Sequence, residues 1–420
     1  MASRPRVLIV GAGLGGLRAA EGLRAAGYRD EIVIVGDEVH LPYNRPPLSK
    51  AALSSEMSPV DLVFRHRDAI GDVVWRLGTA VTDIDLHERT AHLESGRTLG
   101  FDGLILATGV TARRLLISGP PAQRSAGRFV VRTIEDAHAL RQRLQPGVRV
   151  VVVGAGFIGC EVAATAVALG CSVRCVALDQ RPMVRPLGEA LGAALQRRQE
   201  ERGVRFHLGA TVTAFLGRDQ VRGVLLSDGT ELGADVVVEA LGSRCNTALL
   251  NGYGFDLSDG VLVDGALRPL GDGLDAADGV AVVGDVARFP NPRFGPGAWR
   301  VEHWSVPTDL GRRAGAVLAA YLGSRGDYDQ VVSTPLNVMP SFWSDQYELR
   351  IQSLGMPSLA DPDEVRVLAG DLAGDCIVGY FQGDGLMGVV GVNMTRELNQ
   401  YRAAVGVADQ SSVANQSTMA

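Results

Sequence analysis

The first 40 residues alternate between apolar runs, a glycine turn and a helical pattern. Residues 7–10 are uniformly apolar, as in a strand buried on both faces. A glycine-rich turn follows in residues 11–16, and a stretch rich in Ala, Leu and Arg with helical periodicity continues to Gly27. A second apolar run covers residues 31–35. This order predicts a strand, a turn, a helix and a parallel strand, which together form one βαβ unit.

The same pattern returns later in the chain. An apolar run at residues 150–153 precedes a second glycine turn at 154–159, a helical stretch at 161–169 and another apolar run at 172–176. A repeat on this scale predicts two dinucleotide-binding domains of the Rossmann type. After each unit the chain returns to an apolar strand that ends in small residues, at Thr108 and Gly109 and again at Gly242. A later strand ends at Gly284 and Asp285.

The character of the sequence changes near residue 326, where short strand-like runs replace the longer alternation of strands and helices. We therefore predict an α/β chain with two Rossmann-like domains and a C-terminal α+β domain. The first domain is expected to be split. The expected bounds are 1–111 and 245–325 for the first domain, 112–244 for the second, 326–410 for the third and 411–420 for a tail.

Composition narrows the function classes. Hydrophobic residues make up 46% of the 420 positions and charged residues 21%, and the formal net charge of −6 gives no reason to expect nucleic-acid binding. The five cysteines have neither C-x-x-C nor zinc spacing, so no metal site is expected. Their odd number and the lack of a signal peptide favour a reducing cytoplasm. The longest apolar stretch, 148–170, contains charges and four glycines, so no membrane association is expected.

The first glycine turn has the full context of a nucleotide site. Gly11 permits the tight turn, Gly13 lets the backbone approach a pyrophosphate, and Gly16 lets helix and strand pack closely. Asp37 follows at the distance where an acid accepts hydrogen bonds from a ribose. The structural alternative is a glycine turn in an α/β sheet that binds no nucleotide.

The second turn, with Gly154, Gly156 and Gly159, lacks the ribose acid. The strand that follows it ends at Ala177, and the nearest acid is Asp179. A 2′-hydroxyl favours an acid at the strand end and a 2′-phosphate favours an arginine, so this strand end leaves the coenzyme preference open. We expect a weak preference that leans to NADH. Two nucleotide sites without an evident acid–base pair favour redox chemistry by hydride transfer.

The chain resembles the FAD-dependent ferredoxin reductases of bacterial oxygenase systems. The similarity extends from about residue 6 to about residue 355, and a weaker match follows in the C-terminal domain. The segments that carry it include VIVGDE, PYNRPPLSK, ILATG, VVVGAGFIGCEVAA, VVGDVARFPNP, RVEHW and FWSDQYELRIQSLG. The resemblance implies a glutathione-reductase-like fold, with FAD in the split domain and NAD(P)H in the inserted domain. It also implies electron transfer through FAD to a small iron–sulfur ferredoxin that serves a haem monooxygenase or a dioxygenase, by a monomer or weak dimer.

The resemblance also assigns site residues by position. Catalytic roles fall to Lys50, Glu161 and Trp304, with Lys50 and Trp304 near the flavin ring. Glu161 is expected on the nicotinamide side, where the family pairs it with the lysine. The remaining cofactor contacts are expected from Gly11, Gly13, Leu14, Gly15, Gly16, Asp37, Arg45, Val81, Thr108, Gly109, Arg132, Gly284 and Asp285 for FAD, and from Gly154, Gly156, Phe157, Ile158, Gly159 and Gly242 for the nicotinamide coenzyme.

Each assignment has a plainer alternative. Lys50 and Arg132 could be surface residues, Trp304 could fill the core, and Asp285 or Glu161 could simply complement a helix end. Family members often have polar residues after the tryptophan, where this chain has Val306, Pro307 and Leu310.

The rival functions are a monodehydroascorbate-type or quinone-type reductase and an apoptosis-inducing-factor-like interaction flavoprotein. Disulfide reductases are disfavoured, because no cysteine precedes Cys160.

Overall fold

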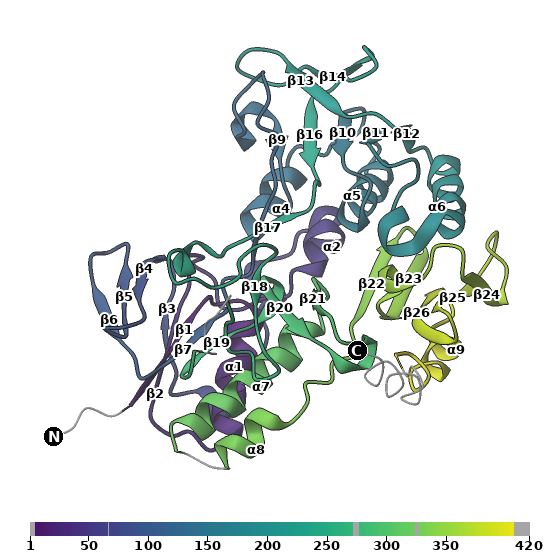
Figure 1. The fold of residues 1–420 in the computed structure, drawn as a ribbon. Coiled ribbons are helices and arrows are strands. Elements are labelled where there is room, and N and C mark those ends of the chain that lie inside the picture. Colours follow the sequence, from purple (N-terminus) through teal and green to yellow (C-terminus); the bar gives the residue numbers. More distant parts are fainter. Residues whose placement is uncertain (1–4, 66, 272–276, 324–326, 407–420) are drawn as a thin grey trace. The chain divides into compact units, whose positions relative to one another are not determined.

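The computed structural model describes residues 5–65, 67–271, 277–323 and 327–406. Contacts divide the chain into two compact units (Figure 1). Unit 1 contains Met1–Asn44, Pro59–Thr111 and Cys245–Ser341, and unit 2 contains Arg45–Ser58, Ala112–Arg244 and Phe342–Ala420. The C-terminal segment therefore shares a compact unit with the second predicted domain, and the division into three domains stays a prediction. The predicted tail, 411–420, lies outside the described residues.

Unit 1 is built on a five-stranded sheet with the order β19-β7-β1-β2-β3, in which all pairings are parallel. The apolar run at the start of the chain is the central strand, and it is almost completely buried. The strands of this sheet are β1 (Arg6–Val10), β2 (Glu31–Val35), β3 (Val74–Arg76), β7 (Gly103–Leu106) and β19 (Val280–Val282). The unit also contains an antiparallel sheet of β4 (Val81–Asp85), β5 (Thr90–Leu93) and β6 (Thr98–Gly100), and a sheet of β18 (Val261–Leu262), β20 (Ala287–Pro290) and β21 (Ala298–Arg300).

Two helices of unit 1, α1 (Leu14–Ala25) and α7 (Val306–Tyr321), pack against each other at unusually short range. Figure 1 shows them side by side below the sheet. Glycines make this approach possible. A Cβ atom at Gly315 would lie 2.5 Å from the backbone nitrogen of Leu23, and one at Gly311 would lie 2.8 Å from the carbonyl oxygen of Gly15. The pair therefore fixes the first glycine turn relative to the start of α7.

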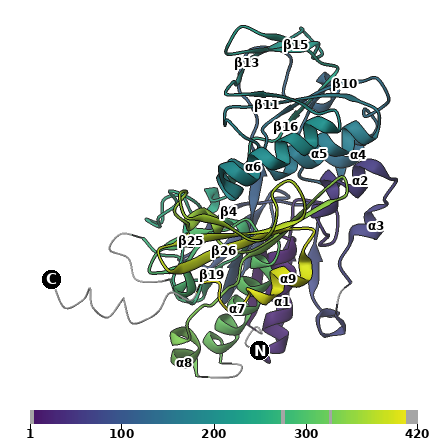
Figure 2. The same ribbon diagram turned by 90° about the vertical axis from the view of Figure 1, so that its right-hand side faces the viewer.

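The first part of unit 2 is a second parallel sheet, with the order β12-β11-β10-β16-β9. Each crossover from β9 to β12 steps in the same direction, so right-handed connections place α4, α5 and α6 on one face, as Figure 2 shows. The other face is covered by a three-stranded antiparallel sheet, with Val151, Val237 and Phe215 in the shared core. The elements are β9 (Arg128–Phe129), α4 (Ile134–Arg141), β10 (Arg149–Val153), α5 (Phe157–Ala168), β11 (Ser172–Ala177), α6 (Val184–Glu201), β12 (Arg205–Leu208), β13 (Val212–Leu216), β14 (Gly223–Leu226), β15 (Glu231–Gly233) and β16 (Val236–Glu239).

The last part of unit 2 is a five-stranded sheet with the order β22-β23-β26-β25-β24. Strand β26 is buried along its whole length, which accounts for the apolar run near the end of the sequence. The elements are β22 (Ser341–Gln346), β23 (Leu349–Gly355), β24 (Val365–Gly370), β25 (Cys376–Gln382), β26 (Gly385–Val392) and α9 (Thr395–Gln400). Two short elements from an early segment, η1 (Pro46–Ser49) and α2 (Ala51–Ser54), complete the parts of unit 2 that concern the site.

Among the described residues, no helix combines the length and apolar character that crossing a bilayer requires.

The packing of α1 against α7 generates a first prediction. Gly315→Ala should lower the free energy of unfolding by about 1–3 kcal/mol, because the added methyl group meets backbone atoms that cannot move aside. This loss should outweigh the gain in helix propensity, which is at most about 1 kcal/mol. Thermal unfolding followed by circular dichroism measures the effect. Gly265→Ala is the matched control, because a Cβ atom there meets nothing within 4 Å, and equal melting temperatures for both variants would contradict this account.

Candidate functional site

The first glycine turn of unit 1 has the geometry of a phosphate-binding turn. Gly11 has a φ of +114°, and a Cβ atom there would lie 2.1 Å from the carbonyl oxygen of Ala107. A Cβ atom at Gly16 would lie 2.1 Å from the carbonyl oxygen of Gly11, whereas one at Gly13 would meet nothing within 4 Å. Gly13 is the N-cap of α1 and has no capping side chain, so the first N–H groups of the helix are available to an anion. The turn fits a dinucleotide pyrophosphate.

The second turn, in unit 2, repeats this geometry. Gly154 has a φ of +108°, with a hypothetical Cβ atom 2.2 Å from the carbonyl oxygen of Ala240. At Gly159 the equivalent atom would lie 2.0 Å from the carbonyl oxygen of Gly154, and at Gly156 the space is again open. Helix α5 also begins without a side-chain cap. Each unit therefore offers its own dinucleotide turn.

The two residues after Gly156 differ in their surroundings. The ring of Phe157 packs against that of Phe342, with 4.5 Å between the centroids. Ile158 leaves 46% of its surface exposed, although it is an apolar residue on a buried helix. Leu14 occupies in the first turn the place that Phe157 occupies in the second, and each is the first residue of its helix.

The residues expected at the ribose differ between the two turns. Asp37 is exposed two residues after β2, whereas β11 ends at Ala177, as the sequence predicted. The carboxylate of Asp179 pairs with Arg185, with Oδ2 3.1 Å from Nε. Arg181 is likewise paired with a glutamate, Glu189. The strand end itself therefore carries a small apolar side chain and no acid.

Lys50 and Glu161 meet in unit 2, as the resemblance implied. Lys50 follows η1, and its Nζ lies 2.9 Å from Oε1 of Glu161 on the first turns of α5. Glu161 is 4% exposed. Burial raises the pKa of its carboxyl group, while the charge of Lys50 and hydrogen bonds from Lys50, Ser344 and Ser49 oppose that rise. An ammonium group and a carboxylate in this setting form a charged pair that is largely withdrawn from water.

Two serines complete the surroundings of this carboxylate. Ser49 donates to Oε2 of Glu161 at 2.5 Å, and Ser344 on β22 donates to Oε1 at 2.6 Å. Neither serine was predicted from the sequence. Ser344 lies in the FWSDQ segment, which is one of the segments that carry the family resemblance. Nothing in that segment indicated that the hydroxyl group of Ser344 would point toward α5.

Three other predicted cofactor residues of unit 2 lie in two places. Arg45 donates to the carbonyl oxygen of Arg132 at 2.6 Å, which brings these two arginines together ahead of α4. Gly242, assigned to the nicotinamide coenzyme, has a φ of +80°, and its carbonyl oxygen accepts from the backbone of Arg113 at 3.0 Å.

In unit 1, the predicted residues Thr108 and Gly109 are held by one asparagine. Thr108 donates to the carbonyl oxygen of Asn246 at 2.8 Å, and the Asn246 side chain donates back to Thr108 at 2.9 Å. The backbone N–H of Asn246 reaches the carbonyl oxygen of Gly109 at 3.1 Å. These bonds fix the chain where strand β7 ends. Val81 is half-buried at the start of β4.

Trp304 also belongs to unit 1 and is not plain core filler, because 36% of its surface is exposed. Its indole N–H donates to Oδ1 of Asn44 at 2.8 Å, and its ring lies against Phe64. Gly284, with a φ of +79°, and Asp285 form a short turn beside the start of α7.

The residues that depart from the family pattern, Val306, Pro307 and Leu310, are buried in the first turns of α7. They contribute to the core at this helix start, and polar groups are replaced there by apolar packing.

The sequence matches two protein families. The family described as pyridine nucleotide-disulphide oxidoreductase covers residues 5–306, and the family described as reductase C-terminal covers residues 341–418. Together they confirm the predicted α/β class with Rossmann-like domains and a distinct C-terminal α+β region.

Individual relatives agree over almost the whole chain. The sequence is 36% identical over 402 residues to the biphenyl dioxygenase system ferredoxin–NAD(+) reductase component of Paraburkholderia xenovorans (strain LB400), covering 95% of this chain and 93% of the relative. It is 34% identical over 412 residues to putidaredoxin reductase of Pseudomonas putida, covering 96% and 92%.

A solved structure extends the comparison to three dimensions. A chain in the covalent putidaredoxin reductase–putidaredoxin complex is similar to this one, with a TM-score of 0.85, 32% identity and coverage of 96% of this chain and 93% of that chain. Sequence identity, length and fold thus agree, and the chain belongs to the pyridine nucleotide-disulphide oxidoreductase family, within its FAD-dependent ferredoxin reductases.

Proposed function

We propose that this protein takes a hydride from NADH onto FAD and passes the electrons singly to a small iron–sulfur ferredoxin, which serves a haem monooxygenase or a dioxygenase. The observation that carries the proposal is the buried pair of Lys50 and Glu161 beside the second dinucleotide turn. The relatives named as ferredoxin reductase components of oxygenase systems support the choice of acceptor. They do not favour the quinone-type or interaction-protein alternatives.

The two glycine turns bind and orient the cofactors in this proposal. Bound FAD supplies the ability to accept two electrons together and release them one at a time. The turn at Gly13 would hold the FAD pyrophosphate, with Asp37 at its ribose, and the turn at Gly156 would hold the nicotinamide coenzyme. Lys50 and Glu161 would place a fixed charge pair at the nicotinamide side. This pair orients groups and excludes water, and proton transfer is not required of it.

The cysteines do not support a dithiol mechanism. Cys160 and Cys175 are completely buried, and burial raises the pKa of the Cys160 thiol to about 12. A thiol of this kind stays protonated and unreactive at neutral pH. All five cysteines are free, which supports a cytoplasmic location as part of the proposal.

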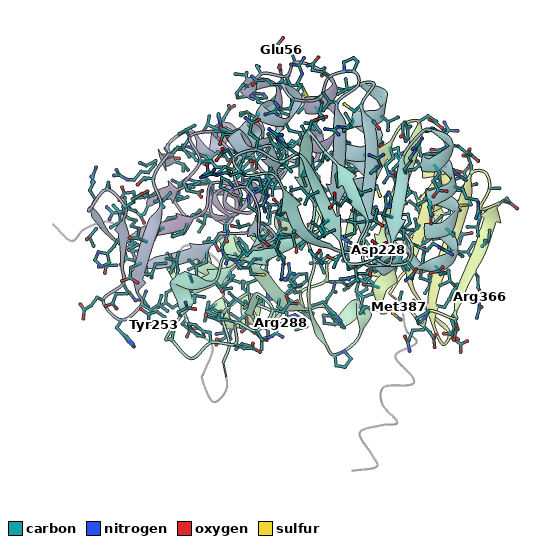
Figure 3. All side chains as sticks on the ribbon, turned by 90° about the horizontal axis from the view of Figure 1, so that it is seen from above. Glu56, Asp228, Tyr253, Arg288, Arg366 and Met387 are labelled. Atoms are coloured by element: carbon teal, nitrogen blue, oxygen red, sulfur yellow. The ribbon has the colours of Figure 1, made fainter. Side chains whose placement is uncertain are left out.

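The structure changes which arginines could steer an acidic ferredoxin. The sequence offers several arginines near the predicted flavin segment. Arg288, labelled in Figure 3, pairs with Asp256, and Arg300 pairs with two acids. Arg313 donates to backbone carbonyl groups, one of them at 2.7 Å. Arg312 is exposed, so it is the better candidate for an electrostatic contact.

The proposed acceptor is tested by steady-state assays of the FAD-loaded protein. NADH should support reduction of cytochrome c only when an acidic [2Fe–2S] ferredoxin is added, and this rate should fall as ionic strength rises. Arg312→Glu should raise the ferredoxin concentration needed for half-maximal rate while the rate of flavin reduction by NADH stays the same. A protein that reduces cytochrome c equally fast without ferredoxin, or binds no FAD, would show that the proposed function is wrong.

The strand end at Ala177 predicts a weak coenzyme preference. Because no acid stands there, the ribose of NADH lacks hydrogen bonds to a carboxylate, and the 2′-phosphate of NADPH is not repelled by one. The specificity constants for the two coenzymes should therefore differ by less than about a hundredfold, in favour of NADH. Ala177→Glu should increase the preference for NADH, chiefly by weakening NADPH. Steady-state kinetics with both coenzymes measure the effect.

The matched control is Ala177→Gln, because glutamine has nearly the same shape as the glutamate of Ala177→Glu but carries no charge. Rejection of NADPH by more than about a thousandfold in the unaltered protein would mean that another acid, such as Asp179, reaches the ribose.

A further inference from the structure

A chain of buried polar side chains ends on Oε1 of Glu161, whereas Ser49 donates to Oε2. Gln199 on α6 donates through Nε2 to Oε1 of Gln346 at 2.6 Å. Gln346 donates through Nε2 to Oγ of Ser344 at 3.1 Å, and Ser344 donates to Oε1 of Glu161 at 2.6 Å. Gln199, Gln346 and Ser344 are each 0% exposed. Three elements of unit 2 therefore converge on one carboxylate: α6, β22 and α5.

The hydrogen bonds of this chain all run in the same direction. Each group accepts from the one before it and donates to the next, and the last acceptor is a carboxylate oxygen. An ionised carboxylate can only accept, so it suits the end of such a chain. If Glu161 were protonated and donated to Ser344, the hydroxyl hydrogen of Ser344 would lose the carboxylate oxygen as its acceptor. The hydrogen could not turn toward Gln346 either, because Gln346 presents an N–H donor to the Ser344 oxygen. The arrangement therefore favours the ionised form of Glu161.

Other groups around Glu161 act on the same equilibrium. Lys50, from the η1 segment, contributes the positive charge. Cys160, the preceding residue of α5, is fully buried, its thiol pKa is raised by burial, and it interacts electrostatically with Glu161. Cys175 on β11 faces Cys160, whose thiol adds to the rise that burial causes in the pKa of Cys175. The acid next to Ser344 on β22, Asp345, pairs with Arg350 instead, and α6 contributes the uncharged amide of Gln199.

We propose that Ser344 and Gln346 of the C-terminal sheet are positioning residues for Glu161: they hold its carboxylate ionised and oriented toward Lys50. This inference rests on the proposed function for the role of Glu161 at the nicotinamide, but not for the hydrogen-bond chain itself. It gives the C-terminal sheet a part in the redox site, since one of its strands fixes the charge state of a residue in the coenzyme-binding domain.

The sequence provides a direct probe, because Lys50 is its only lysine. A holoenzyme grown with [ε-¹³C]lysine has a single labelled side chain, whose NMR signal reports the charge of the carboxylate beside it. Titration of the oxidised protein should therefore show one step that marks protonation of Glu161.

In Ser344→Ala this step should move to higher pH by about one to two units, because a hydrogen bond to a charged group is lost. Gln346→Met leaves every contact of Glu161 in place and should move the step in the same direction by less. Ser344→Thr keeps the hydroxyl group and should restore the original position. Ser353→Ala is the matched control, since Ser353 is a buried serine on the neighbouring strand β23. It should leave the step unchanged.

An identical step in the unaltered protein, Ser344→Ala and Gln346→Met would overturn the proposal. If Ser344→Ala does not fold, the comparison of Gln346→Met with Ser353→Ala decides the question. The pH profile of anaerobic flavin reduction by NADH separates this inference from the proposed function. A shifted NMR step with an unshifted rate profile would uphold the positioning role of Ser344 and refute the role of Glu161 in hydride delivery.

Discussion

The buried carboxylate of Glu161 is the constraint on which the packing around the second glycine turn of unit 2 depends. Burial alone would neutralise it, because moving a charge out of water is costly unless partners replace the lost hydration. Lys50 and the hydroxyl groups of Ser49 and Ser344 provide those partners. Ser49 and Lys50 are neighbours in an early segment, whereas Ser344 lies almost 300 positions further along the chain. Within unit 2, the ion pair links this early segment to α5, and the Ser344 hydrogen bond links α5 to the C-terminal sheet.

Close backbone packing at glycines supports both dinucleotide turns. At Gly16 and Gly159 even a methyl group would collide with the preceding turn. Gly13 and Gly156 leave open space, so a ligand can approach the protein backbone there. The same sequence pattern thus serves two purposes at neighbouring positions: tight packing below the turn and access above it. In unit 1 the glycines of α7 extend this principle, since they bring the helix start that follows Trp304 against α1.

Local pattern predicted the glycine turns, the strand end at Ala177 and the apolar strands, because each is set by residues within one βαβ unit. The meeting of Lys50 and Glu161 was implied by the resemblance alone. Ser344 and Gln346 were missed because alternate polar residues in a short strand usually face solvent, and only the packing of β22 against α5 and α6 reverses that expectation. The sequence also cannot show that Arg288 and Arg300 already have acidic partners.

In the proposed function, the charge pair of Glu161 with Lys50 prepares the site for hydride transfer, and its cation has to be a lysine. Lys50 is the only lysine in a chain that otherwise uses arginine, and a guanidinium group is larger, planar and differently hydrated. The most direct measurement is anaerobic stopped-flow reduction of the bound flavin by NADH in Lys50→Arg. A rate at least about tenfold below that of the unaltered protein, with FAD still bound, is the predicted result. Equal rates would contradict the claim.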